Sequence, residues 1–292
     1  TLAVAQDRGK VAQPAQRQQQ PAAAQPAMNM DQLLQLWAGQ SAKLETLELD
    51  IYRIDEQKAW GDVEHYLGHA AFKAPQLAFL DFRKVKMQEK ADPKDKQKKV
   101  VVPVMKNNKI DSGPYETIVC TGDEVWHYRY DVKKIFVFPL DKNQRKRAIE
   151  EGPLPFLFNM NVADAQRRYQ MELVGEDQKK GYMVKVVPQL KEDQESFSVA
   201  WVQLDKKFLL PTRIYLLAPD KKSSKDFQLS TIQANKAVNK QFFVGVNPGK
   251  GWKVERNPGG PAPAPADAKG LRRQPNGQPP QRAAAPADGQ PR

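Results

Sequence analysis

Three histidines and a single cysteine are the side chains of this 292-residue sequence that could most readily do chemistry, and they fall into two groups. The first group is Glu64, His65 and His69, whose side chains are all types that bind zinc. In a strand, His65 and His69 would share one face but stand roughly 13 Å apart at full extension. One zinc ion cannot bridge that distance unless the strand bulges, so we expect no metal site here.

The second group is Cys120 and His127, a pair that could act as a nucleophile and its base. Such a dyad needs a third group that orients the imidazole, and a cleft for the substrate. Cys120 ends an apolar run and is better interpreted as a small buried hydrophobic residue. The carboxylates of Glu192, Asp193 and Glu195 lie in a polar turn, where we expect them to be solvated.

Sequence motifs for catalysis are missing as well. The chain contains no G-x-S-x-G, no P-loop and no G-x-G-x-x-G pattern. We therefore expect a protein that is not an enzyme and that carries neither a metal nor a cofactor.

Residues 115–140 show most clearly which elements must position any site. Three runs of β-branched and aromatic residues alternate with turn residues at Thr121-Gly122-Asp123 and near Asp131, a pattern typical of an antiparallel meander. Both faces of these strands carry large apolar side chains. Neither face can be left bare to water, so we expect something to cover or bind the sheet.

The rest of the central region predicts two helical pieces among many strands. Residues 29–44 predict an amphipathic helix, with Asn29 as N-cap and Gln32 as its capping-box partner. Residues 156–168 predict a short second helix after the break at Pro153 and Pro155. Strand patterns without βαβ alternation fill the remainder, so the fold class is α+β, with a strongly curved antiparallel sheet. Two helical pieces can cover one face as a lid, which predicts an apolar cavity between helices and sheet.

Composition divides the chain into three parts. All 25 Phe, Trp and Tyr residues lie within 29–256, whereas twelve of the 23 prolines lie outside this range. We expect one domain at 29–256 and disordered tails at 1–28 and 257–292. Residues 2–6, LAVAQ, resemble the end of an apolar leader with a small-x-small cleavage site, which favours export; a random Ala-rich beginning is the alternative.

The net charge of +12 is concentrated in one segment. Residues 83–109 carry ten Lys and Arg against three Asp and Glu, and strand-like flanks predict a long hairpin with a lysine-rich tip. A solvated edge or loop is one interpretation. Attraction to an anionic membrane surface or to an acidic partner is the other. Lysine outnumbers arginine and no nucleic-acid-binding motif is present, so we expect no nucleic acid as partner.

The order of these elements resembles the periplasmic outer-membrane lipoprotein carrier (LolA-like) fold. The resemblance spans nearly all of 29–256. It rests on the N-terminal helix running into the first strand, a strand ending in Phe72-Lys73-Ala74-Pro75, the stretch 118–128 (IVCTGDEVWHY), Pro155-Phe156-Leu157 before a helix, and the closing segment 242–254. With its Gln/Ala/Pro-rich tails the whole chain looks most similar to a secreted domain family of uncharacterised function from planctomycetes.

The resemblance implies an unclosed β-barrel of about eleven strands, capped by the N-terminal helix and a short central helical lid. In the family, the apolar cavity holds the acyl chains of a lipoprotein, and an arginine before the strand proline latches the lid. Ala74 occupies that position here, preceded by Lys73. The latch is therefore missing or supplied elsewhere, which puts the family's release mechanism in doubt but not the fold.

The function we predict is a periplasmic or secreted, monomeric binding protein that holds lipid or lipoprotein acyl chains. The alternative is an interaction or sensor module of the envelope that uses the same fold without lipid transport. The residues expected to line the cavity are large and apolar: Leu33, Leu34, Trp37, Phe72, Phe79, Trp126, Phe136, Phe138, Phe156, Phe158 and Trp201. Which strand face they line is not decided by the mixed pattern.

Overall fold

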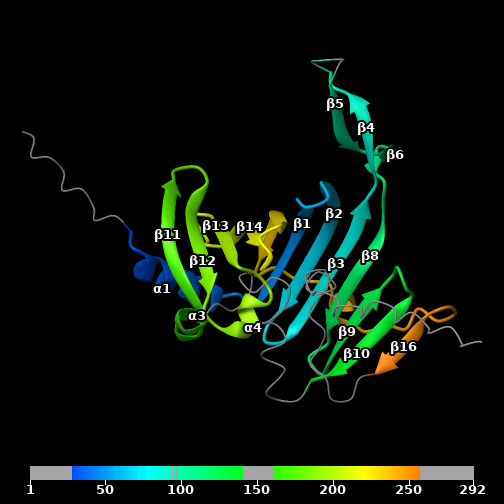
Figure 1. Ribbon diagram of the computed structural model, residues 1–292. Helices are drawn as coiled ribbons and strands as arrows, with labels where there is room; N and C mark the ends of the chain where they lie inside the picture. Colours follow the sequence, from blue (N-terminus) through cyan, green and yellow to red (C-terminus); the bar gives the residue numbers. More distant parts are fainter. Residues whose placement is uncertain (1–27, 94, 96–97, 141–160, 257–292) are drawn as a thin grey trace, which may run out of the picture.

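A twelve-stranded sheet is the framework of the computed structural model, which describes residues 28–93, 95, 98–140 and 161–256 (Figure 1). Its strands lie side by side in the order β11-β12-β13-β14-β15-β1-β2-β3-β8-β9-β10-β16. Their bounds are β1 Thr46–Gln57, β2 Asp62–Lys73, β3 Leu77–Val85, β8 Ser112–Cys120, β9 Glu124–Arg129, β10 Lys134–Pro139, β11 Tyr169–Asp177, β12 Gly181–Pro188, β13 Val199–Leu204, β14 Pro211–Leu217, β15 Ser223–Ala234 and β16 Lys253–Arg256.

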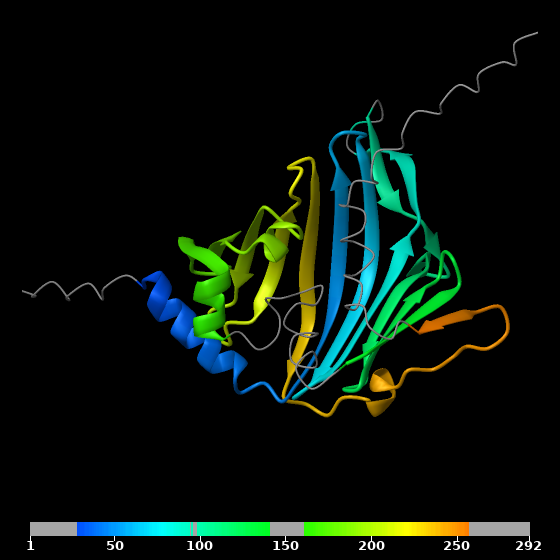
Figure 2. The ribbon, with the colours of Figure 1, turned by 60° about the horizontal axis from the view of Figure 1, so that its bottom comes forward.

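The sheet is open and almost wholly antiparallel, as the sequence predicted. Only β10 and β16 run parallel, with Ile135 opposite Val254. In the described part of the chain, β11 and β16 are the two edges and do not pair with each other. The predicted meander is confirmed as β8, β9 and β10, with Val119 opposite Trp126 and Trp126 opposite Val137. The strands curve strongly across the molecule (Figure 2).

The N-terminal helix α1 (Met30–Ser41) begins with the predicted capping box. The Asn29 side chain accepts a hydrogen bond from the Gln32 N–H at 2.9 Å, and the Gln32 side chain accepts one from the Asn29 N–H at 3.1 Å. The other helices are short: α3 (Val162–Arg168), α4 (Lys191–Gln194) and the 3-10 helix η1 (Lys240–Phe243). α3 confirms the end of the predicted central helix, whose residues 156–160 lie outside the described residues. Within 28–140 and 161–256, apart from the gaps near residue 95, no helix has the length and apolarity to cross a membrane.

A narrow ribbon extends the ends of β3 and β8 away from the main sheet (Figure 1). It consists of β4 (Met87–Ala91) paired with β5 (Lys99–Pro103), and a shorter hairpin of β6 (Met105–Lys106) and β7 (Lys109–Ile110). This ribbon is the predicted lysine-rich hairpin.

Alternation along the strands gives the sheet two faces of different character. We call the face that carries Leu47, Leu49 and Ile51 the inner face, since these residues share a core with the buried Trp37 of α1. The other face, the outer face, carries a small separate core of Val119, Tyr128, Ile135 and Val137. The two cores therefore lie on opposite sides of one layer of strands.

Candidate functional site

The inner face is one apolar surface that crosses the whole sheet. Its side chains come from nearly every strand because alternate residues point to the same side. Val184 and Val202 belong to it near one edge, and Val125 and Phe138 near the other. The wider set also contains Leu47, Leu49, Ile51, Ala70, Phe72, Leu80, Phe82, Cys120, Val186, Ala200, Ile214, Phe227 and Leu229.

The described helices lie at one end of this surface. α1 contacts α3 and β11, and α4 contacts β12 (Figure 2). The buried carboxylate of Asp193 on α4 accepts a hydrogen bond from Arg168 Nε at 3.1 Å, which ties α4 to the end of α3. The prediction that Asp193 is solvated in a polar turn was therefore wrong. The ion pair with Arg168 explains why a carboxylate is buried there.

Six of the residues predicted to line a cavity belong to the core of the inner face. Leu33, Leu34 and Trp37 reach it from α1, where they are at most 2% exposed. From the strands come Phe72, Phe136 and Phe138. The structure brings these six into one continuous core, in which their shared side is set by strand parity and by the apolar stripe of α1.

Three predicted residues point to the outer face instead. Phe79 stacks on Phe242 of η1 with ring centroids 4.8 Å apart. Trp126 packs with the outer core, and Trp201 lies against Tyr215 at 5.6 Å. The outer side chains on β8, β9 and β10 are covered by the closing segment, where Tyr128 Oη donates to the Val246 carbonyl at 2.9 Å and accepts from its N–H at 2.8 Å. The remaining two predicted residues, Phe156 and Phe158, lie outside the described residues.

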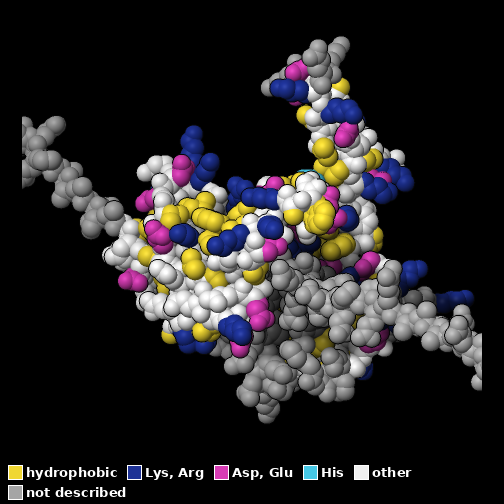
Figure 3. All heavy atoms as spheres, in the orientation of Figure 1, with side chains coloured by type: hydrophobic (Ala, Val, Ile, Leu, Met, Phe, Trp, Pro, Cys, Tyr) yellow, Lys and Arg dark blue, Asp and Glu magenta, His cyan; other side chains and the backbone are white. Residues whose placement is uncertain are grey.

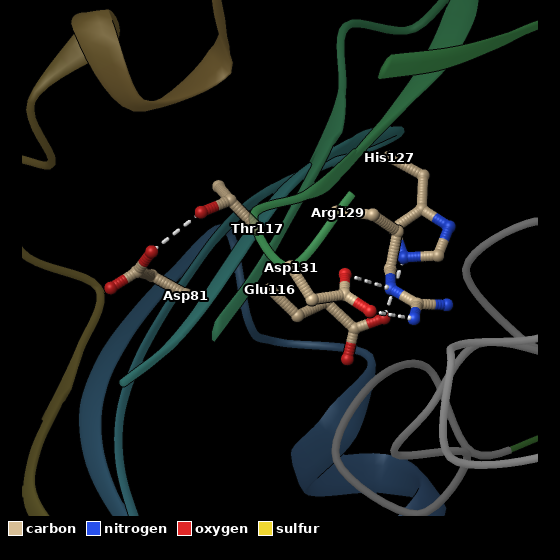
Figure 4. A network of polar contacts seen from close by, with 6 residues as sticks. All are labelled: Asp81, Glu116, Thr117, His127, Arg129 and Asp131. Atoms are coloured by element: carbon tan, nitrogen blue, oxygen red, sulfur yellow. Dashed lines mark hydrogen bonds and ion pairs between the residues drawn. The ribbon is translucent and has the colours of Figure 1, made fainter. Parts of the chain in front are cut away.

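The inner face also holds a buried ion pair (Figure 4). His127 Nε2 lies 2.6 Å from Glu116 Oε1, and the two side chains are 5% and 1% exposed. Beside them Arg129 donates to Asp131 at 3.0 Å. This hydrogen bond lowers the pKa of the Asp131 carboxyl and raises that of the Arg129 guanidinium. Thr117, one residue from Glu116 on β8, points to the other side of the sheet and donates to Asp81 at 2.6 Å.

The geometry of Cys120 does not fit a catalytic dyad. In the pairing of β8 with β9, Cys120 lies opposite Val125, whereas His127 lies opposite Ile118. The Cys120 thiol donates to the Gln76 carbonyl at 3.1 Å, and burial raises the pKa of the thiol. A protonated, buried thiol is a poor nucleophile, so the interpretation of Cys120 as a small core residue is confirmed.

His65 and His69 lie on the outer face and have separate partners. His65 Nδ1 lies 2.9 Å from the Tyr52 hydroxyl, and His69 Nδ1 lies 2.9 Å from Asp50 Oδ1. Among the described residues, no group of three His, Cys, Asp or Glu side chains is arranged to hold a metal ion.

A charged cluster at one end of the inner face was missed by the sequence reasoning. Arg53 is fully buried, 3.0 Å from Asp55 Oδ2, with its guanidinium 4.1 Å from the centroid of the Tyr66 ring and 4.5 Å from that of Phe82. Burial, together with the hydrogen bond that its hydroxyl donates to Glu64, raises the pKa of Tyr66. The signal was in the alternation: Leu47, Leu49, Ile51 and Arg53 all point inward, so the series passes from apolar to charged.

Comparisons with known proteins were made for the whole chain. No family model matches it, and no curated protein matches it significantly. Three solved structures illustrate the similarities found by structure. An uncharacterized conserved protein from Thermus thermophilus is 14% identical with a TM-score of 0.43, covering 77% of this chain and 97% of that one. A LolA superfamily protein from Nitrosomonas europaea is 7% identical with a TM-score of 0.34, covering 75% and 99%. LprF from Mycobacterium bovis is 9% identical with a TM-score of 0.36, covering 72% and 94%.

At these identities the similarity concerns the fold alone and assigns no ligand. A protein titled as a LolA superfamily member is among the matches, as the sequence resemblance predicted.

Proposed function

We propose that this protein is a non-enzymatic, exported binding protein that holds the acyl chains of a lipid or lipoprotein against the inner face of its sheet. The observation that supports this most is the extent of the apolar surface. It continues from β12 to β10, whereas α1, α3 and α4 lie against the β11 and β12 end. An apolar surface of this width, on a sheet that does not close on itself, suits a long apolar ligand better than a compact polar one.

The energetics of such a ligand are favourable. Each buried methylene contributes about 0.8 kcal/mol, so a chain of about fourteen methylenes gives on the order of 11 kcal/mol before ordering costs are subtracted. Six of the residues we predicted for the cavity, Phe138 among them, share this surface. We propose the same role for Phe156 and Phe158.

The charged cluster gives the proposed ligand a direction. Along β1 the inward residues change from Leu47 and Leu49 to Arg53 and Asp55. An acyl chain belongs at the apolar end, and the polar part of the lipid belongs toward Arg53. This arrangement would satisfy both parts of an amphiphile on one face.

We further propose α1 as a movable cover over the ligand. Its connection to β1 is fixed by Asn235, whose side chain accepts from the Glu45 N–H at 2.9 Å and donates to the Lys43 carbonyl at 3.0 Å. Thr46 adds a hydrogen bond to the Lys236 carbonyl at 2.6 Å. The helix can then move about a fixed end while the strand stays in place.

Two neighbouring residues on β10 provide a matched test. Phe138 points to the inner face and Val137 to the outer core, and both are at most 3% exposed. The full chain would be purified without detergent, extracted with organic solvent for mass spectrometry, and titrated with a fluorescent fatty acid. We expect extractable lipid, and we expect Phe138→Ala to weaken fatty-acid binding about fivefold or more. Val137→Ala should lower stability but leave the affinity of the folded protein unchanged.

Three outcomes would contradict the proposal. The first is a protein that is empty as purified and does not bind the fatty acid. The second is equal loss of affinity in the Phe138 and Val137 variants. The third is capture of a protein partner that survives substitution of Trp37 and Phe138 by serine, in a chain that carries no lipid; this would favour the interaction module.

A further inference from the structure

One end of the sheet gathers two turns and the projecting ribbon, and we call it the lysine end. It comprises the β1–β2 turn (58–61), the β14–β15 turn (218–222) and the ribbon (86–110). The first two turns are directly joined, because the Lys58 N–H donates to the Lys222 carbonyl at 2.9 Å. The ribbon leaves the same end, since β3 runs antiparallel to β2 with Lys84 opposite Tyr66. Figure 2 shows both turns and the ribbon at this end.

Large apolar side chains are exposed here without an evident role in the fold. Trp60, in the β1–β2 turn, is 80% exposed, the largest fraction among the big hydrophobic residues of the described ranges. Val63 beside it, and Val101 and Met105 in the ribbon, are each about half exposed or more. Figure 3 shows apolar and basic side chains interspersed along the ribbon. Surface tryptophans of this kind are typical of sites that meet another phase or partner.

Lysines surround these apolar tips. Lys58, Lys221 and Lys222 are exposed in the two joined turns. The carboxylate of Asp220 accepts hydrogen bonds from the backbone N–H groups of Lys222 and Ser223, which outweigh its slight desolvation, lower its pKa and leave the ammonium groups at the rim. In the ribbon, Lys90, Lys98, Lys99, Lys106 and Lys109 are exposed as well.

We infer that the lysine end docks on the surface of an anionic lipid bilayer, with the Trp60 turn entering the headgroup layer. Tryptophan favours the membrane–water interface because its ring is apolar and its N–H can stay hydrated. Clustered lysines are attracted to anionic headgroups without needing a fixed geometry. The combination of an exposed indole with flexible cations distributed over three separate segments matches a fluid charged surface.

The opposite end of the sheet supplies a control of similar composition. There the β13–β14 turn carries Phe208, which is 53% exposed, next to Lys206 and Lys207. Lys206 is paired with Glu176 at 2.5 Å, and the Lys207 ammonium lies 4.9 Å from the Phe208 ring centroid. An aromatic residue and two lysines are thus present without the wider field of lysines.

The test uses the full chain and vesicles of two compositions, phosphatidylcholine alone and phosphatidylcholine with phosphatidylglycerol. We expect cosedimentation with the anionic vesicles, weakened by salt. Joint replacement of Lys58, Lys221 and Lys222 by glutamate should lower vesicle affinity at least about tenfold. Trp60→Ala should lower it about threefold or more, and Phe208→Ala should change it by less than about twofold. Circular dichroism would establish that each variant is folded.

Several results would overturn the inference: no binding to anionic vesicles, equal binding to neutral vesicles, or an equal effect of Phe208→Ala and Trp60→Ala. Binding to a polyglutamate peptide but not to vesicles would show that the lysine end serves an acidic protein instead. These outcomes are independent of fatty-acid binding, so a chain that binds fatty acid but no vesicles would lose only this inference.

Discussion

The inner and outer faces of the sheet are built from the same strands but solve the problem of burial differently. The inner face is apolar across the sheet and includes Trp37 of α1. The outer face is apolar only near β3, β8, β9 and β10, where Phe242 and Trp252 from the closing segment pack on it. Elsewhere it carries ion pairs, such as Arg213 with Asp226 at 2.8 Å. Large apolar residues on both faces of the meander therefore reflect two different covers, one on each side.

The comparison teaches that only one face is available for a ligand. The outer core is closed by a segment that also adds a strand, β16, to the sheet and hydrogen-bonds through Tyr128. The described helices on the inner face are joined to the sheet by short connections instead. We therefore expect the outer face to behave as permanent structure and the inner face as the functional surface.

The largest expected effect is on the inner face. Phe227 is 1% exposed on β15, so Phe227→Ala should lower the free energy of unfolding by about 3–5 kcal/mol, through lost burial and a residual cavity. Trp201→Ala, at a half-buried outer position against Tyr215, should cost only about 1 kcal/mol. Urea denaturation measures both. Equal losses would mean that the two faces do not differ in packing.

The second prediction compares carboxylates on the two faces. Glu116→Gln removes the charge of a buried carboxylate paired with His127, and we expect a loss of about 3 kcal/mol. Glu48→Gln removes the charge of an outer carboxylate 3.2 Å from His69, where both side chains are about 30% exposed. That change should cost less than about 1 kcal/mol. Denaturant unfolding of the two variants side by side checks this, and a larger loss for Glu48→Gln would contradict it.

A glycine tests how tightly the outer cover is packed. A Cβ atom on Gly245 would lie 2.4 Å from the indole of Trp126, so Gly245→Ala must displace that ring or lift the segment, at about 1–3 kcal/mol. Gly175→Ala is the matched control, because a Cβ there meets nothing within 4 Å. Thermal unfolding and tryptophan fluorescence report the two effects. If the Gly245 variant is as stable as the Gly175 variant, the closing segment is a loose cover.

The smallest effect concerns pH and the outer face. Partial burial lowers the pKa of His65, so the folded protein keeps this imidazole neutral at pH values where the unfolded chain would protonate it. His65 should therefore contribute stability above its unfolded pKa of about 6.5, and this contribution should be lost as the pH falls below it. Comparing unfolding at about pH 8 and about pH 5.5 for the native chain and His65→Gln tests the sign. A native chain that gains more stability than the variant at the lower pH would refute it.

Local signals in the sequence were sufficient for much of the fold. The turn at Gly122, with a backbone φ of 94°, and the Asn29 capping box each depend on a few adjacent residues. The parallel pairing of β16 with β10 was not predictable in this way, because it joins segments more than a hundred residues apart in the sequence.

The candidate site was predictable only in part, for a physical reason. Trp126 and Phe138 are both large and apolar, so hydrophobicity alone could not separate an outer from an inner position. Deciding between them required knowing that residues near Phe242 cover the outer face. Arg53, in contrast, could have been found from its place in the inward series of β1.

The fixed end of α1 has a consequence for selectivity on the proposed function. A helix that is anchored by Asn235 at one end competes for the inner face at the high effective concentration of a tethered segment. A ligand must then displace Leu33, Leu34 and Trp37 rather than water. Short acyl chains bury too little surface to outcompete these three side chains, whereas each added methylene improves the balance. The helix would thereby act as an internal competitor that sets a minimum chain length.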